Sequence, residues 1–236
     1  MRVSITIAYD GTSYLGSQIQ TETNNTIFTQ MQKVLSQLGI NEKVIASGRT
    51  DKGVHATGQV CHVDLPAFWS DTTKLKRVLN EMLPSSIVVK HIDHVDDDFH
   101  ARYSAKKRIY RYIIKESASN PFESNFVTFL NSLNFRQLES NIKLFIGEHN
   151  FKQFMKTGSD VKTTTRVIYK AFAYQHNGYI VLNFEGNGYL RSQIRLMVGA
   201  LLQLDEMQIK EQLSCEKIHK IKPAPSNGLY LAKIKY

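Results

Sequence analysis

The apolar residues of this chain repeat at two different spacings, and the order of the spacings limits the possible folds. Residues 3–7 alternate between apolar and polar or small side chains, which predicts a half-buried strand. Apolar residues at helical spacing follow over 27–38, between the candidate N-cap Thr26 and the candidate stop Gly39. Each half of the chain has the order strand, helix, strands, helix, strand. This order predicts an α+β protein made of two ferredoxin-like halves with mainly antiparallel sheets.

The remaining elements are predicted from the same two spacings. Asn177 and Gly178 form a strong hairpin signal between two predicted strands. Strands are expected at 57–65, 86–92, 108–115, 166–175, 179–186 and 228–236, and helices at 75–82, 138–146 and 194–202. We place the boundary between the halves within residues 93–107, and divide the chain into 1–100 and 101–236.

The net charge of +9 comes from the second half of the chain. Residues 1–100 hold 9 Lys and Arg against 11 Asp and Glu, whereas residues 101–236 hold 21 against 10. A surplus of +11 in one half suggests a polyanion partner, most often a nucleic acid. A soluble surface that happens to be basic would give the same totals.

A glycine-rich stretch, ASGRTDKGVHATGQV at residues 46–60, holds the first candidate for chemistry. Asp51 lies between Arg49 and Lys52, and two glycines that permit tight turns flank this group. In an extended segment Arg49 and Asp51 share a face, where the guanidinium keeps the carboxylate ionised and oriented. Such a carboxylate can attack an anomeric carbon or abstract a proton. The alternative is an ordinary Asp–Arg pair that only fixes the loop.

A second constellation, FHARYSAKKRIYRY at residues 99–112, mixes cations with aromatic side chains. Cations bind phosphates, and aromatic faces stack on exposed bases. In a strand Tyr110 and Tyr112 share one face, so that one tyrosine face can line a pocket. The candidate phosphate contacts are Lys106, Lys107 and Arg108. The alternative is a strand with core tyrosines and solvated lysines.

The third constellation is GNGYLRSQIRLMVGAL at residues 186–201. Arg191 and Arg195 are four residues apart and are expected on one face of a helix. They could contact phosphate or a carboxylate such as Asp51. On spacing alone, a solvated helix face is the better explanation.

No pattern in the sequence indicates a metal, a phosphate-binding glycine loop or a membrane span. The histidines, Cys61 and Cys215 lack zinc-ligand spacing, and the acidic run 96–98 lacks a calcium-loop pattern. Neither GxGxxG nor GxxxxGK[ST] occurs, and no run of eighteen apolar residues exists. The two distant cysteines and the absence of a signal-peptide pattern predict a reducing cytoplasm.

Together these segments resemble the tRNA pseudouridine synthase A family, in order and through nearly the whole chain. The matching blocks are YDGTSYLGSQ at 9–18, SGRTDKGVHATGQV at 47–60, FHARYSAKKRIYRY at 99–112, GEHNFKQF at 147–154, GNGYLRSQIRLMVG at 186–199 and APSNGLYLAKIKY at 224–236. Two positions depart from the usual pattern. Ser17 stands where the family usually has tryptophan, and Gln193 stands where an apolar residue is more usual. Neither is a catalytic position, but the first is expected to alter packing near the RNA.

The resemblance implies an isomerase that converts uridine to pseudouridine at positions 38, 39 and 40 of the tRNA anticodon stem-loop. It implies a homodimer without cofactor or metal, and an RNA-binding cleft between the two halves. Asp51 takes the position of the catalytic aspartate, and Arg49 that of the arginine thought to help displace the target base. Tyr110 takes the position of the active-site tyrosine, and Arg191 that of the arginine that pairs with the aspartate.

Two other functions remain compatible with the residues. An RNA-binding module without catalysis would not need Asp51, so that Asp51→Ala would leave its function intact. A nucleoside hydrolase or glycosylase could use the same carboxylate, but it would release free uracil.

Overall fold

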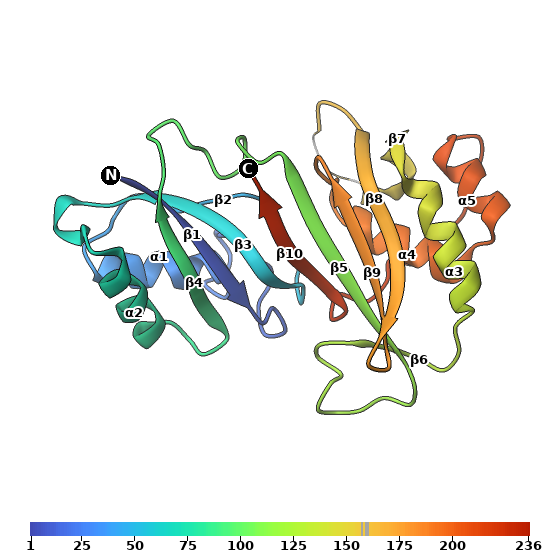
Figure 1. Cartoon of the computed structure of the whole chain (residues 1–236), viewed down its shortest axis with the longest axis horizontal. Coiled ribbons are helices and arrows are strands. Elements are labelled where there is room, and N and C mark those ends of the chain that lie inside the picture. Colours follow the sequence, from blue (N-terminus) through green and yellow to red (C-terminus); the bar gives the residue numbers. More distant parts are fainter. Residues whose placement is uncertain (157, 159–160) are drawn as a thin grey trace. The chain divides into compact units, whose positions relative to one another are not determined.

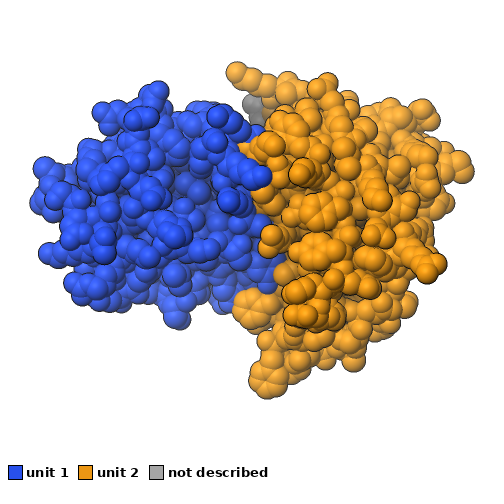
Figure 2. All heavy atoms as spheres, in the orientation of Figure 1, with its two compact units in different colours: residues 1–106, 230–236 blue, residues 107–229 orange. Residues whose placement is uncertain are grey.

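The computed structural model describes residues 1–156, 158 and 161–236, and these divide into two compact units (Figure 2). Unit 1 is Met1–Lys106 together with Tyr230–Tyr236, and unit 2 is Lys107–Leu229. The sequence did not suggest that the last seven residues group with the first unit. They do so because the C-terminal strand pairs with a strand of unit 1.

Unit 1 is a sheet with two α-helices (Figure 1). Its elements are β1 (Arg2–Tyr9), α1 (Ile27–Gln37), β2 (Ile45–Ala46), β3 (His55–Asp64), η1 (Ala67–Trp69), α2 (Thr72–Met82), β4 (Ile87–His94) and β10 (Leu229–Lys235). The first residue of β10, Leu229, belongs to unit 2, and the rest of this strand belongs to unit 1. The strand order is β4-β1-β3-β10, and β2 also pairs with β3. Strand β10 runs parallel to β3, and the other pairs are antiparallel.

The core of unit 1 follows the predicted alternation. Val3, Ile5 and Ile7 are fully buried, while their neighbours on β1 are half-exposed. The Thr26 side chain accepts a hydrogen bond from the Thr29 backbone N–H, which confirms the predicted N-cap of α1. Gly39 has φ +74°, a left-handed conformation that suits the residue after a helix end. The first strand and helix therefore form where the spacing predicts them.

The strands of unit 2 are mainly antiparallel, and its described residues also form three α-helices. Its elements are β5 (Lys107–Glu116), β6 (Thr128–Leu130), α3 (Phe135–Asn141), η2 (Ile142–Phe145), β7 (Gly147–Asn150), η3 (Phe151–Phe154), β8 (Thr165–His176), β9 (Tyr179–Gly186), α4 (Gln193–Gln203) and α5 (Glu206–Leu213). The order is β5-β9-β8-β7, with β6 parallel to β5 and the other pairs antiparallel. Ala171 and Ala173 of β8 are buried, whereas Phe172 and Tyr174 on its other face are exposed.

The β8–β9 hairpin confirms the Asn-Gly signal. Asn177 and Gly178 have φ of 49° and 79°, so both turn residues are left-handed, as a tight two-residue hairpin requires. The helix predicted over 138–146 is only partly right. It begins as α3, continues as the 3₁₀ turn η2 from Ile142, and ends before Gly147 with φ +112°.

Candidate functional site

The loop that carries Asp51 joins β2 to β3 in unit 1, and its first residues are held to β3. The Ser47 backbone N–H donates to the Val60 carbonyl at 2.8 Å, and the Ser47 hydroxyl donates to Gln59 Oε1 at 2.6 Å. Gln59 Nε2 donates to the Gly48 carbonyl at 2.9 Å. Ser47 and Gln59 are buried, so this side-chain network fixes the start of the loop without solvent competition.

The middle of the loop is held by residues from the N-terminal segment. Thr50 N–H donates to Ser17 Oγ at 2.8 Å, and Ser17 N–H donates to the Thr50 carbonyl at 3.1 Å. Thr50 Oγ1 shares a hydrogen bond of 2.8 Å with the Tyr9 hydroxyl. Burial raises the pKa of Tyr9 to about 12, so that this hydroxyl keeps its proton at neutral pH. Every polar group of Thr50 thus has a partner outside the loop.

The end of the loop is fixed by a tight turn and a close backbone contact. Gly53 has φ +74°, and the Val54 N–H donates to the Asp51 carbonyl at 3.2 Å. Gly11 passes so close that a Cβ added there would lie 2.0 Å from the Val54 carbonyl oxygen. Glycine is therefore required at position 11 to let the N-terminal segment pack against the loop.

His55 continues this packing at the first residue of β3. It is buried, and its Nδ1 accepts a hydrogen bond of 3.1 Å from the Gly11 N–H. A ring nitrogen that accepts has no proton to give to Asp10, whose Oδ1 lies 3.2 Å away. The ring stacks on Tyr230, with centroids 4.8 Å apart. His55 therefore ties the N-terminal segment and β10 to the loop.

Exposure along the loop separates the side chains that support it from those available to a ligand. Thr50 and Val54 are buried, Asp51 is half-buried, and Arg49 and Lys52 are exposed. Arg49 makes no ion pair with any residue that the structure describes, so the predicted Arg49–Asp51 pair does not form. Because water solvates an exposed guanidinium well, an ion pair between Arg49 and Asp51 would add little stability.

Two of the candidate cations on β5 already have partners within unit 2. Lys107 Nζ lies 3.0 Å from Glu185 Oε1 and 4.8 Å from the centroid of the Tyr169 ring. Arg108 Nη1 donates to the Asn187 carbonyl at 2.9 Å. Lys106 ends the first segment of unit 1 and is exposed, and its backbone N–H donates to the Lys235 carbonyl at 2.9 Å. The three residues thus differ in how freely they can meet a phosphate.

Tyr110 lies on the same strand, half-buried against Tyr189. The two rings meet edge to face, with centroids 5.2 Å apart. The Tyr189 hydroxyl is buried and has no hydrogen-bond partner among the described residues. Burial, helped by Tyr110 and Glu185, raises the pKa of Tyr189 well above its usual value. Tyr112, two residues on, is fully buried, which agrees with the alternative of a core tyrosine at this position.

Arg191 corrects one prediction from the sequence, because it does not share a helix face with Arg195. Helix α4 begins only at Gln193, after Ser192 with the left-handed φ of 59°. Gln193 Oε1 accepts from the Leu190 N–H at 2.8 Å, which closes the turn before the helix. Arg191 is exposed on this turn, while Arg195 lies within α4 and donates from Nε to the Ala224 carbonyl at 2.7 Å. Asp51 and Arg191 belong to different units, so their pairing remains a prediction.

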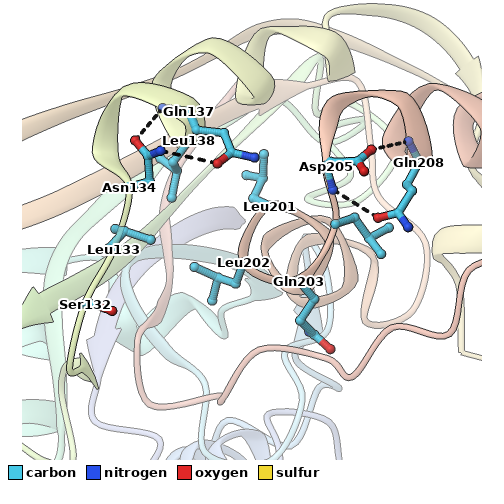
Figure 3. A pocket seen from close by; sticks show the side chains of 11 residues that line it. Ser132, Leu133, Asn134, Gln137, Leu138, Leu201, Leu202, Gln203, Asp205 and Gln208 are labelled. Atoms are coloured by element: carbon cyan, nitrogen blue, oxygen red, sulfur yellow. Dashed lines mark hydrogen bonds between the residues drawn. The ribbon is translucent and has the colours of Figure 1, made fainter.

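The described residues hold a pocket of about 420 Å³ in unit 2 (Figure 3). It lies between the start of α3 and the turn from α4 to α5. Asn134 accepts from the Gln137 N–H and Asp205 from the Gln208 N–H, so its polar groups serve as helix caps. None of the predicted site residues lines this pocket.

Neither a metal site nor a membrane helix is found in the part of the chain that the structure describes. No group of three or more His, Cys, Asp or Glu side chains there could hold a metal ion. None of the described helices is long and apolar enough to cross a membrane.

Several residues that hold the loop were not expected to contact it. Ser17, Tyr9 and Gln59 hold it through buried hydroxyl and amide groups, but they come from separate segments of the chain. No spacing rule joins residues that only the fold brings together. Tyr189 was likewise missed, although it lies within the third constellation, residues 186–201.

The chain is similar to known proteins over its whole length. A family profile described as tRNA pseudouridine synthase matches residues 5–104 and 142–236. A protein named tRNA pseudouridine synthase A from Campylobacter jejuni (strain RM1221) is 36% identical over 100% of both chains. A protein of the same name from Wolinella succinogenes is 38% identical over 98% of this chain and 92% of its own. A crystal structure of a Cbf5-Nop10-Gar1 complex covers 85% of this chain and 45% of its own, at 14% identity and a TM-score of 0.38, too low to establish a common fold.

Proposed function

The chain belongs to the tRNA pseudouridine synthase family, and from this premise we propose that it modifies positions 38, 39 and 40 of the tRNA anticodon stem-loop with Asp51 as its catalytic residue. The chain is an isomerase that acts on tRNA and converts uridine to pseudouridine. The positions and the residues that act on them are the proposed part.

The observation that carries the role of Asp51 is the contrast between the residue and its neighbours. Thr50 and Val54 are buried and hydrogen-bonded, while Asp51 between them is half-buried on a tight turn. A carboxylate on a fixed backbone can be presented to a ligand with little reorganisation, which is what catalysis by a positioned group needs.

The reaction requires one bond to break and another to form at the same sugar carbon. The bond from C1′ to N1 of uracil breaks, the base rotates, and C1′ bonds to C5, which then loses its proton while N1 takes one up. Asp51 would act at the sugar, either by attack on C1′ or by removal of the C2′ proton. Because the target lies in a stem, it must first leave the base stack, at a cost of a few kcal/mol.

The other candidate residues take supporting roles in this proposal. Exposed Arg49 would occupy the space that the flipped base leaves. Arg191 would pair with Asp51 once tRNA is bound, and Tyr110 would contact the target base. Lys106, Lys107 and Arg108 would contact phosphates, in keeping with the +11 charge of the second half.

The wider organisation is proposed on the same grounds. The order of the elements suggests two ferredoxin-like halves, and the resemblance suggests an RNA-binding cleft that they share and a homodimer as the active form. The two distant cysteines suggest a cytoplasmic enzyme. Size measurement with and without tRNA would test the dimer.

The decisive test uses tRNA labelled with tritium at C5 of uridine. The isomerisation must release the C5 tritium to water, because C5 forms the new bond to C1′. A glycosylase would release labelled uracil instead, and a binding module would release neither. A matched tRNA with cytidine at positions 38, 39 and 40 should release no tritium, and release from it would contradict the proposed positions.

A further inference from the structure

Ser17 holds the residue before Asp51 through both backbone polar groups of that residue. The Thr50 N–H donates to the Ser17 hydroxyl oxygen, and the Thr50 carbonyl accepts from the Ser17 N–H, at 2.8 and 3.1 Å. Ser17 and Thr50 are 1% and 8% exposed, so water cannot replace these bonds at low cost. This reciprocal pair joins segments that are 33 residues apart.

One of these bonds acts directly on the geometry of Asp51. The Thr50 carbonyl and the Asp51 N–H belong to one planar peptide group, which ends at the Asp51 Cα. When the Thr50 oxygen is held by Ser17, that plane cannot rotate freely. The orientation in which the Asp51 side chain leaves the loop therefore depends on Ser17.

Ser17 is itself fixed to the start of α1. The Ser17 carbonyl accepts from the Phe28 N–H at 3.0 Å, and the Gly16 carbonyl accepts from the Ile27 N–H at 3.3 Å. The first N–H groups of a helix have no partner within it, so the carbonyls of Gly16 and Ser17 supply acceptors for two of these groups in α1. Gly16 has φ +112°, and a Cβ added there would lie 3.1 Å from the Thr50 oxygen. Gly16 and Ser17 thus fix the position of the loop relative to α1.

We propose that Ser17 is a positioning residue for the isomerisation. Its hydroxyl holds the Arg49–Thr50 peptide and its backbone N–H holds the Thr50–Asp51 peptide, and together they keep Asp51 in its reactive orientation. The inference rests on the proposed role of Asp51. The hydroxyl is needed as an acceptor for the Thr50 N–H.

The test compares Ser17→Ala with Ser86→Ala. Ser86 is the matched control because its hydroxyl pairs with the Tyr14 hydroxyl at 2.7 Å, in the same unit, whereas the polar groups of Thr50 bond to Ser17 and Tyr9. We expect the single-turnover rate of tritium release by Ser17→Ala to fall about 10- to 100-fold, the scale of a small misplacement of a catalytic group. The Kd for tRNA should stay within about threefold of the wild type. Ser86→Ala should keep both the rate and the Kd.

A second measurement does not depend on activity. In Ser17→Ala the Thr50 amide loses its acceptor, so its hydrogen exchange should become faster, while in Ser86→Ala it should not change. If the wild type releases no tritium, the proposed function fails, but exchange of the Thr50 amide still tests the contact. If Ser17→Ala keeps the wild-type rate, loses tRNA binding as strongly as turnover, or leaves Thr50 exchange unchanged, the inference is wrong.

Ser17→Cys covers the case in which the alanine variant does not fold. Its sulfur fills the same site but is a weak acceptor, so its rate should lie below that of the wild type. A cysteine variant with the wild-type rate would overturn the inference.

Discussion

Three tyrosines of unit 2 carry hydroxyl groups in different surroundings, and these surroundings separate function from stability. The Tyr112 hydroxyl bonds to Thr128 Oγ1 at 2.7 Å and donates to the Pro225 carbonyl at 2.9 Å. The Tyr189 hydroxyl is buried without a partner among the described residues. Tyr110 is half-buried, and its ring meets the Tyr189 ring. The same substitution, Tyr to Phe, should therefore have three different results.

Tyr110→Phe should fold normally and bind tRNA but lose about a hundredfold or more in turnover, as expected when a group that transfers a proton or holds the base is removed. Tyr112→Phe is the control, since it should lower stability and keep turnover. Tritium release by each variant at saturating tRNA checks this. If Tyr110→Phe turns over at the native rate, its hydroxyl has no role and only stacking or packing remains.

Tyr189→Phe should leave the free energy of unfolding unchanged or raise it by up to about 1 kcal/mol, because it removes a buried hydroxyl that makes no bond. Tyr112→Phe should lower the free energy of unfolding by about 1 kcal/mol, because it removes a hydrogen-bonded hydroxyl and leaves Thr128 without that partner. Urea unfolding of both variants measures the difference. A loss of more than about 1 kcal/mol in Tyr189→Phe would mean that the hydroxyl has a partner after all.

At this scale the sequence located the Asp51 loop but not what holds it. Glycines, Arg49, Asp51 and Lys52 are adjacent in the chain, so local pattern is enough to single them out. Ser17 and Tyr9 reach Thr50 only after β1 and the segment before α1 have packed, and no local pattern contains that information.

Among the elements, the contact between β3 and β10 depends on one glycine. A Cβ added at Gly58 would lie 2.4 Å from the Ala232 carbonyl oxygen, a backbone atom that cannot turn away. Gly58→Ala should therefore destabilise the protein by about 3 kcal/mol, the upper range for overpacking.

Gly178→Ala is the matched control for this substitution. Gly178 has φ +79°, and nothing lies within 4 Å of an added Cβ. Gly178→Ala should therefore lower the free energy of unfolding by only about 1 kcal/mol, because alanine disfavours the left-handed backbone. Thermal unfolding of the two variants gives the comparison. Equal losses would show that β10 does not approach β3 as closely as the structure has it.

The limits of sequence prediction at this scale are visible in α4. The apolar spacing over 194–202 correctly predicted the helix, but the start of the helix is set by the left-handed Ser192. A serine in that conformation is uncommon, so sequence placed Arg191 on the helix face. The closing strand was also predicted, whereas its parallel partner β3 is far away in the chain and follows from the fold alone.

For the whole molecule, the basic charge should appear in the salt dependence of tRNA binding. Lys106→Gln should reduce the slope of log K against log salt by about 1, because an exposed lysine that meets a phosphate releases about one counterion. Lys107→Gln should change the slope less, since Glu185 already lies 3.0 Å from that ammonium group. Binding measured over a range of salt decides this, and a larger change for Lys107 would show that the ion pair opens on binding.

Stability of the whole chain should fall in mild acid because of His62. This side chain is 4% exposed, and burial, together with the charges of His100 and Arg2, lowers its pKa to about 4. An unfolded histidine titrates near 6.5. Below that pH the unfolded state binds a proton that the folded state does not, so the free energy of unfolding should fall by about 3 kcal/mol between pH 6.5 and 4.

His62→Asn should remove most of this slope, because it keeps an acceptor for the Ala101 N–H but cannot be protonated. The exposed His91 on β4 provides the control, His91→Asn. Urea unfolding across this pH range gives the slopes, and an unchanged slope in His62→Asn would rule out His62 as the cause.

The central claim is that Asp51 carries out the isomerisation, and single-turnover tritium release by Asp51→Asn tests it most directly. The substitution keeps the shape of the side chain and removes its charge. The account predicts no release above the background without enzyme, while tRNA binding stays within about tenfold of the wild type, or about 1.4 kcal/mol. Release by Asp51→Asn at a rate comparable with that of the wild type would contradict it.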